Sequence, residues 1–193
     1  MGYIDGMIIT PNTLIDADNL SAFNQQCEEY TRTEGSEIQH WGSGDFANTV
    51  IRVKKIRTPQ GNGLLVVAGN KKEVFLVCRL IAAPVPQGVF PWGRKVYVMD
   101  RIRVHNNYVG RGLAPAMYRW LADQGYTIIS DSHQNGNSLA VWHKMASRGG
   151  VFTANLNEMT WRPYDPTRVE DWMLFGNGDG SRYWPIRFVL PGK

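Results

Sequence analysis

The sequence predicts an α+β fold in a single domain over residues 1–193, with a mixed and mostly antiparallel sheet flanked by helices. Two observations carry this prediction. Three alternating apolar segments follow one another across short turns between residues 49 and 81, and a strand, a glycine-rich loop, a helix, a strand and a second helix follow in that order between residues 96 and 150. The chain has 193 residues, 43% of them hydrophobic, which suffices for one sizeable core and is short for two independent domains.

Composition and charge argue against several classes of protein. No apolar run reaches the roughly 18 residues of a membrane span, and the first 25 residues lack the basic and apolar regions of a secretory signal, so we expect a cytoplasmic protein without a membrane partner. The two cysteines, Cys27 and Cys78, lack the spacing of a zinc site and are expected to be reduced thiols, with no metal bound. A net charge of +4 fits a solvated surface as well as an anionic partner.

The N-terminal half is expected to contain one helix and three strands. Apolar residues recur at helical spacing between Asp16 and Tyr30, which predicts an amphipathic helix. The segments 49–56, 64–68 and 74–81 are separated by turns that contain Gly and Asn, and they predict an antiparallel meander. Prolines and glycines between residues 83 and 93 disfavour both helix and sheet, so we expect a loop there.

The C-terminal half begins with a predicted strand over residues 96–104. Asp100 lies on the same face of this strand as its apolar side chains, which are Val96, Val98, Ile102 and Val104. Residues 105–114 form a loop with two glycines and lead into a helix, for which Gly125 is the expected C-terminal cap.

Three further elements complete the predicted fold. Residues 126–130 form a short buried strand, and a second helix runs from Asn137 to Arg148. The strand patterns of residues 169–175 and 183–190, joined by a glycine-rich turn, predict a hairpin within the C-terminal segment 151–193.

The loop between strand and helix carries the clearest functional signal. Its sequence from Val104 to Ala114, VHNNYVGRGLA, resembles the pyrophosphate-binding motif Gln/Arg-x-x-Gly-x-Gly/Ala, which the GCN5-related N-acetyltransferases (the GNAT family) carry at the end of their fourth strand. Gly112 and Ala114 match the last two fixed positions. Val109 replaces the Gln or Arg at the first, and Gly110 and Arg111 fill the variable positions.

Binding through such a motif depends on backbone atoms. Small residues let a ligand approach the chain, and free N–H groups at a helix N-terminus hold a diphosphate. The resemblance therefore implies that acetyl-CoA or coenzyme A is bound by the loop residues Val109, Gly110, Arg111, Gly112, Leu113 and Ala114, with a charge-assisted contact from Arg111. The missing side-chain contact at Val109 predicts weaker binding. Alternatively, the two glycines serve only the turn.

A second resemblance follows in the next helix. GNAT proteins often carry an Asn followed seven residues later by a Tyr, and here Asn135 and Trp142 hold these positions. The sequences of residues 130–132 and 142–144 also resemble those of GNAT-related proteins carried by bacteriophages, which would act in the host cytoplasm. The resemblance covers about residues 96–150, the coenzyme-binding half, and the rest of the chain agrees only in the order of its elements.

The family resemblance implies an acyl-CoA-dependent N-acyltransferase, which moves an acetyl group from acetyl-CoA to an amine of a protein, small molecule or nucleic acid. Backbone groups of the strand, including Ile102 and Val104, would hold the pantetheine arm. Asp100 is the candidate base, because a carboxylate on an apolar strand face is desolvated unless it is paired, and desolvation makes it a better proton acceptor. The alternative for Asp100 is an ion pair with a neighbouring arginine.

Trp142 stands where the family commonly keeps the tyrosine that protonates the departing thiolate. An indole N–H is not a usable acid at neutral pH, so either another group supplies the proton or catalysis is weak. Alternatively, Trp142 simply packs its helix against the sheet. A second hypothesis is therefore a catalytically impaired GNAT-like binding protein, as a phage protein acting on a host macromolecule. The sequence is compatible with a dimer without requiring one.

Overall fold

The computed structural model describes residues 3–4, 7–8, 36–41, 49–70, 73–83, 91, 95–131, 136–165, 167 and 186–193. The chain divides into two compact units. The first unit comprises residues 1–81 and 100–114, and the second comprises residues 82–99 and 115–193. The α+β class and the mixed, mostly antiparallel sheet are confirmed. The helix predicted for residues 16–30 lies outside the described residues.

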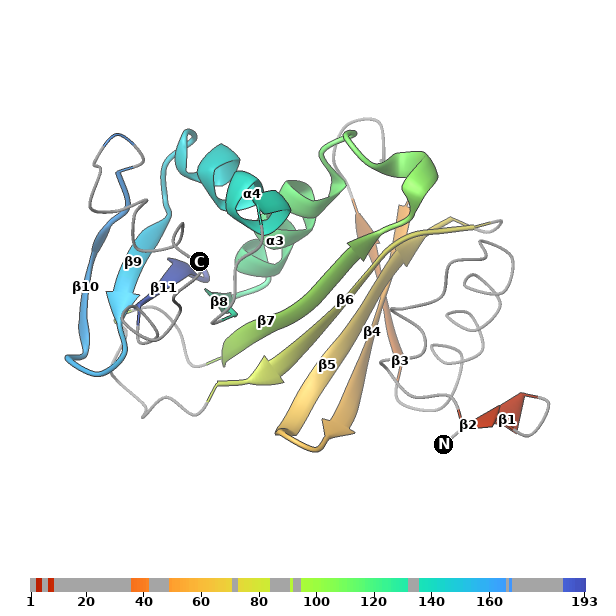
Figure 1. Ribbon diagram of the computed structural model, residues 1–193. Coiled ribbons are helices and arrows are strands. Elements are labelled where there is room, and N and C mark those ends of the chain that lie inside the picture. Colours follow the sequence, from red (N-terminus) through yellow and green to blue (C-terminus); the bar gives the residue numbers. More distant parts are fainter. Residues whose placement is uncertain are drawn as a thin grey trace. The chain divides into compact units, whose positions relative to one another are not determined.

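The first unit is built on an antiparallel meander (Figure 1). Its strands are β3 (Ser36–Trp41), β4 (Thr49–Thr58), β5 (Gly61–Gly69), β6 (Val74–Ala82) and the C-terminal part of β7 (Lys95–Val104), and a separate short pair is formed by β1 (Tyr3–Ile4) and β2 (Met7–Ile8). The prediction of β4, β5 and β6 is confirmed. β3 was not predicted, because its sequence, SEIQHW, mixes polar and apolar residues without a strand-like run.

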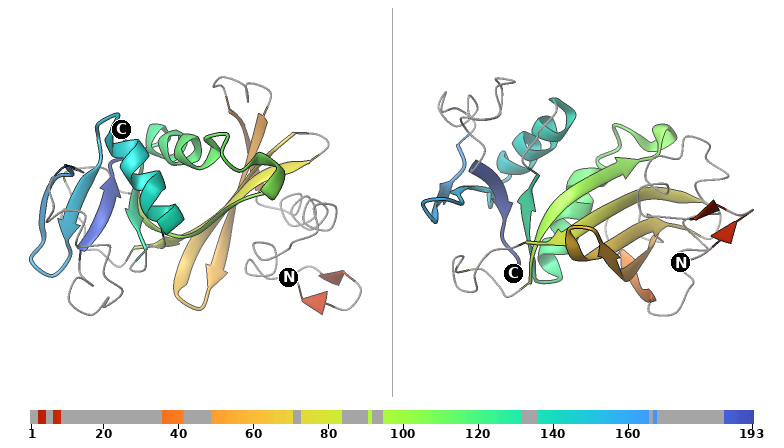
Figure 2. Two further views of the ribbon diagram at one scale, coloured as in Figure 1. Left: turned by 45° about the horizontal axis from the view of Figure 1, so that its top comes forward. Right: turned by 60° about the horizontal axis from the view of Figure 1, so that its bottom comes forward.

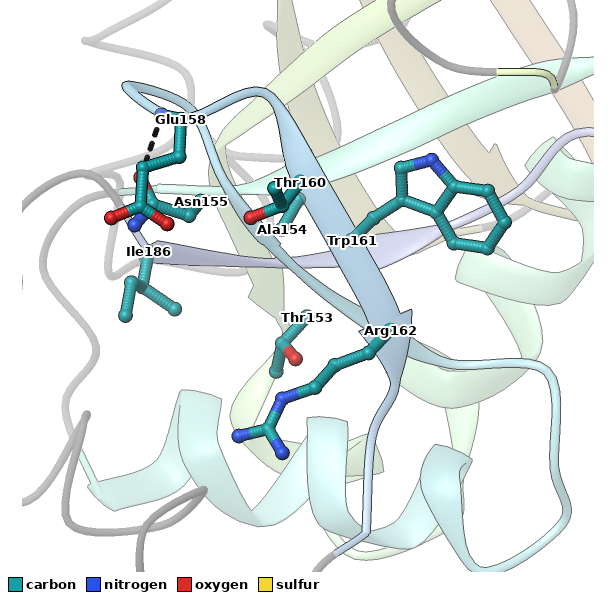
Figure 3. A pocket seen from close by; sticks show the side chains of 8 residues that line it. All are labelled: Thr153, Ala154, Asn155, Glu158, Thr160, Trp161, Arg162 and Ile186. Atoms are coloured by element: carbon teal, nitrogen blue, oxygen red, sulfur yellow. Dashed lines mark hydrogen bonds between the residues drawn. The ribbon is translucent and has the colours of Figure 1, made fainter.

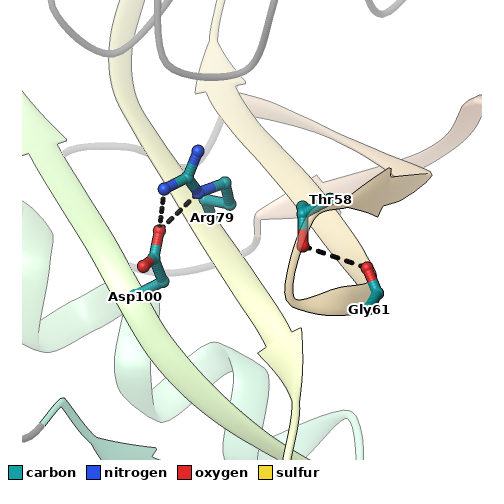
Figure 4. Close-up of polar contacts among 4 residues, drawn as sticks. All are labelled: Thr58, Gly61, Arg79 and Asp100. Atoms are coloured by element: carbon teal, nitrogen blue, oxygen red, sulfur yellow. Dashed lines mark hydrogen bonds and ion pairs between the residues drawn. The ribbon is translucent and has the colours of Figure 1, made fainter.

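Burial explains the sequence of the central strands. Every residue of β5 from Gly63 to Gly69 is buried, as is every residue of β6 except Ala82, so both strands are buried on both faces and, apart from Arg79, are apolar there. The turn between β4 and β5 depends on Gly61, whose φ of +130° is left-handed backbone, and the Thr58 hydroxyl donates to the Gly61 carbonyl at 3.0 Å (Figure 4).

The second unit contains both described α-helices (Figures 1 and 2). Its elements after the first part of β7 are α3 (Leu113–Asp123, which starts in the first unit), β8 (Tyr126–Ser130), α4 (Gly136–Ala146), β9 (Phe152–Asn155), β10 (Thr160–Pro163) and β11 (Ile186–Leu190). β7 and β8 run parallel, and the other pairs are antiparallel. The hydrogen-bonded strand order is β10-β9-β11-β8-β7-β6-β5-β4-β3, and β7 contributes residues to both units.

The predicted C-terminal hairpin is tested only at its second strand. Residues 186–190 form β11, which lies between β8 and β9 and pairs with both. Residues 169–175, its predicted partner, lie outside the described part of the chain. The described hairpin of the segment 151–193 is β9 with β10, which was not predicted because each strand has only four residues and the second contains Pro163.

The two helices of the second unit pack on each other, and α4 packs on β11. The Arg119 guanidinium of α3 donates to the Met145 carbonyl of α4 at 3.1 Å. Trp142 of α4 stacks on Phe188 of β11, with ring centroids 5.3 Å apart, and meets Tyr118 of α3 edge-on at 4.9 Å. Among the described residues, no helix is both long and apolar enough to cross a membrane.

Candidate functional site

The predicted coenzyme site begins where β7 extends beyond the end of its parallel partner, β8. Pairing of β7 with β8 runs from Lys95 opposite Tyr126 to Met99 opposite Ser130, where β8 ends. β7 continues to Val104, and in the described part of the chain no strand pairs with it beyond Met99 on that side. Such an edge offers backbone groups to an extended ligand. Ile102 and Val104 lie on it and are half-buried.

The loop after β7 is an ordered structure. One turn of 3₁₀-helix, Asn106–Tyr108, is capped by His105, whose imidazole Nδ1 accepts from the Asn107 N–H at 3.3 Å. The Tyr108 N–H donates to the His105 carbonyl at 2.8 Å. The chain then passes through Gly110 and Gly112, with φ of +83° and +78°, before α3 begins. Both glycines are thus required by the backbone conformation of this turn.

The space over the two glycines is open. A Cβ added at Gly110 or Gly112 would meet no atom of the described residues within 4 Å. Their lack of a side chain is therefore not explained by close packing within the protein, and the surface above them is accessible to another molecule. The arrangement is compatible with both interpretations of the motif, a phosphate-binding loop and a simple turn. The same two glycines form the turn and leave no side chains on its outer surface.

The N-terminus of α3 follows directly. The first N–H groups of a helix have no partner inside it, and here they belong to Gly112, Leu113 and Ala114, while Pro115 has none to offer. No acidic side chain lies in the first turn to neutralise the positive end of the helix dipole. The Leu113 side chain is 1% exposed and belongs to the core, so only its backbone is available to a ligand.

Aromatic contacts fix the position of Arg111. Its guanidinium lies over the Tyr108 ring, 5.3 Å from the centroid, and the Tyr108 ring packs on Phe75 at 4.8 Å. Desolvation and a hydrogen bond to the Glu73 carboxylate raise the pKa of Tyr108, so its hydroxyl stays protonated at neutral pH. The Val109 side chain is 64% exposed and points away from the core. The loop therefore presents one arginine and backbone N–H groups, but no side-chain amide at Val109.

Asp100 forms an ion pair with an arginine, which was the alternative to its role as the base. Its carboxylate accepts from the guanidinium of Arg79 on β6 (Figure 4), whose side chain is 7% exposed against 22% for Asp100. Arg79 was not predicted as the partner of Asp100, although a lone arginine in the apolar run VFLVCRLIA indicates a buried charge that needs a counter-charge. The Asp100 carboxylate is thus engaged by Arg79.

Trp142 is a core residue. Its side chain is 1% exposed and lies between Tyr118 and Phe188, so Trp142 packs its helix against the sheet. Asp100 and residues 102–114 belong to the first unit, whereas Trp142 belongs to the second. Asn135 lies outside the described residues.

Burial shifts the pKa of three other titratable side chains, which are His143 and Arg187 in the second unit and Cys78 in the first. Burial lowers the pKa of His143, and its Nε2 atom is buried without a hydrogen bond in the described structure. Burial also lowers the pKa of Arg187 on β11, which the nearby Asp131 carboxylate opposes. Cys78 is a buried free thiol with a raised pKa, again because of burial. Among the described residues, no three His, Cys, Asp or Glu side chains gather in a way that could hold a metal ion.

The chain was compared with protein-family models, with curated proteins and with solved structures, and none of them matches it.

Proposed function

We propose that this protein is an acyl-CoA-dependent N-acyltransferase whose coenzyme site is the end of β7, the loop after it and the first turn of α3. The observation that carries the proposal is the passage from β7 through two left-handed glycines, with open space above them, into a helix N-terminus without acidic residues. This combination suits a diphosphate group, which is anionic and needs close approach to backbone N–H groups. The sequence resemblance to the GNAT motif points to the same ligand.

Each part of the site has a separate task in this proposal. The N–H groups of Gly112, Leu113 and Ala114 would donate to phosphate oxygens, and Arg111, held over Tyr108, would add a charged contact. The edge of β7 beyond Met99 would pair with the amide groups of the pantetheine arm, as one strand pairs with another. These contacts use the backbone, which is why the loss of the family's side chain at Val109 weakens binding without removing the site.

The residues suggested for proton transfer in the acyl-transfer step are less well placed than those suggested for coenzyme binding. An attacking amine must lose a proton, and the carboxylate suggested for this, Asp100, is engaged by Arg79. Trp142, at the position of the family's acid, is enclosed by aromatic rings. These two observations favour a second candidate function, in which the protein binds coenzyme A but transfers acyl groups slowly or not at all and acts by binding a macromolecule.

Calorimetric titration with acetyl-CoA and with coenzyme A tests the coenzyme site. We expect saturable binding of both, and no heat of binding at about millimolar ligand would refute both candidate functions. Release of free coenzyme A thiol across a panel of amines then distinguishes them. Thiol release with one class of amine supports the acyltransferase, and binding without release from any amine supports the second candidate.

A further inference from the structure

The second unit carries a pocket that shares no described residue with the proposed coenzyme site. It has a volume of about 240 Å³ and lies over the β9–β10 hairpin and the start of β11 (Figure 3). The described residues that line it are Thr153, Ala154, Asn155, Glu158, Thr160, Trp161, Arg162 and Ile186. A pocket of this size suits a small ligand rather than a nucleotide or a coenzyme.

Strand register brings polar side chains of the pocket to one face of the sheet. Thr160 is opposite Asn155 in the β9–β10 hairpin, and Ile186 of β11 is opposite Asn155 on the other side. Residues directly opposite each other point to the same face, as do residues two apart on one strand, which adds Thr153 to the set. The Trp161 side chain points away from these side chains (Figure 3). Hydroxyl and amide groups therefore lie beside the apolar side chain of Ile186.

The Thr153 hydroxyl is the observation that carries the inference. Thr153 is 4% exposed, and within the described part of the chain its hydroxyl forms no hydrogen bond. Native proteins pair buried hydroxyls with a protein group, with water or with a ligand, because an unpaired one is costly. Thr127 on β8 is also buried, and its hydroxyl accepts from the Gly192 N–H at 3.0 Å. Since Thr153 lines the pocket, a bound molecule can supply the hydrogen bond that it lacks.

A turn leaves hydrogen-bond donors and acceptors next to each other in this pocket. The Asn155 side-chain oxygen accepts from the N–H groups of Asn157 and Glu158 at 3.0 and 3.2 Å, so only the amide N–H groups of Asn155 remain for a ligand (Figure 3). The Glu158 carboxylate has no hydrogen bond or ion pair within the described residues, and a carboxylate only accepts. The hydroxyls of Thr153 and Thr160 can do both.

The charges of the pocket favour a neutral ligand. Among the described lining residues, Glu158 is the one acidic side chain and Arg162 the one basic side chain, so their formal charges cancel. Arg162 has an interaction of its own, and a neutral ligand does not require its guanidinium. An ammonium group only donates and a carboxylate only accepts, whereas a hydroxyl group does both and therefore matches the mixed donors and acceptors of this pocket.

We propose that this pocket binds a small neutral molecule with several hydroxyl groups, of about the size of a monosaccharide. One ligand hydroxyl would pair with the Thr153 hydroxyl, and its neighbours would donate to the Glu158 carboxylate and accept from the Asn155 amide. Ile186 offers an apolar surface to the C–H groups of a sugar ring. The inference does not depend on acyl transfer.

Titration of the ¹⁵N-labelled protein with glucose, galactose and mannose, followed by NMR, tests this proposal on the wild-type chain. We expect at least one hexose to shift the amide signals of Thr153, Asn155 and Glu158 saturably, with a Kd of about 10 mM or below. The 2-amino and uronate counterparts of that hexose each carry one charge and should bind at least about threefold more weakly. No saturable shift by any of the three hexoses at about 50 mM, or a charged counterpart that binds as tightly as the neutral hexose, would overturn the proposal.

Thr153→Val tests the role of the buried hydroxyl. The substitution keeps the shape of the side chain and removes a hydroxyl that forms no hydrogen bond within the described residues. We therefore expect an unchanged or higher Tm and a hexose affinity at least about fivefold lower. Thr127→Val is the matched control, because it removes a buried hydroxyl that accepts from Gly192, and it should lower the Tm and leave hexose affinity unchanged. Wild-type affinity in Thr153→Val, or an equal loss of affinity in both variants, would refute recognition of the ligand by the Thr153 hydroxyl.

Discussion

Replacing Gly112 by alanine distinguishes a ligand-binding loop from a simple turn. Gly112 has φ of +78°, a conformation that costs an alanine about 1–2 kcal/mol, of which roughly 0.4–1 kcal/mol is offset because the unfolded chain loses freedom. A Cβ there meets no atom of the described residues within 4 Å, so these residues add no steric cost. The expected loss is about 1 kcal/mol, or about 2–4 °C in Tm for a chain of this size.

Gly125→Ala is the matched control. Gly125 has φ of +81° at the end of α3, and the nearest atom to its Cβ would be the Lys193 carbonyl oxygen at 3.6 Å, an ordinary contact. Thermal denaturation should show similar losses for both variants. Calorimetry should show acetyl-CoA binding at least about tenfold weaker, or about 1.4 kcal/mol, in Gly112→Ala alone, because the methyl group enters the space over the loop. Unchanged affinity in Gly112→Ala would refute the assignment of the loop as a phosphate site.

Three further predictions concern the charged and aromatic side chains. Asp100→Asn should lower the free energy of unfolding in urea by about 2 kcal/mol, because it removes the carboxylate that pairs with the buried Arg79 guanidinium, and adding Arg79→Met should restore part of the loss. If Asp100 is also the base, Asp100→Asn lowers turnover and spares coenzyme affinity. Trp142→Tyr should destabilise the protein by about 2 kcal/mol without raising the rate of thiol release, because the new hydroxyl would be enclosed by aromatic rings; a faster rate would contradict this. Burial lowers the pKa of His143, so the folded protein should lose stability as the pH falls below about 6.5, and urea unfolding of His143→Gln should show a flatter pH dependence.

Periodicity predicted the elements whose side chains alternate or repeat over many residues. β4 to β7, α3, β8 and α4 were found close to their observed bounds, because each is long enough, or bounded clearly enough by glycine, to give an unambiguous pattern. β9 and β10 were not predicted, because each strand is only four residues long. The partner of β11 was also missed, because strand pairing depends on contacts between distant segments and leaves no trace in the local pattern.

The candidate site was predictable where it depends on backbone conformation. The spacing of Gly110 and Gly112 before an apolar helix indicated a turn between strand and helix, and the structure has one in which both glycines are left-handed. The environment of side chains was harder to predict. The position of Asp100 on a strand face left both a base and an ion pair open, and only the fold brings Arg79 of another strand to it. For Trp142, sequence spacing gave the helix and not the aromatic rings that enclose it.

The insertion of β11 between β8 and β9 has a consequence for folding kinetics. β8 and β9 are close in sequence, with only α4 and the residues on either side of it between them, yet in the sheet they are joined through residues 186–190. The sheet of the second unit therefore cannot close until this distant segment arrives, and the large loop that must be closed first slows folding. Until then β8 and β9 each expose an open edge, which makes a nascent or truncated chain that lacks β11 prone to aggregation.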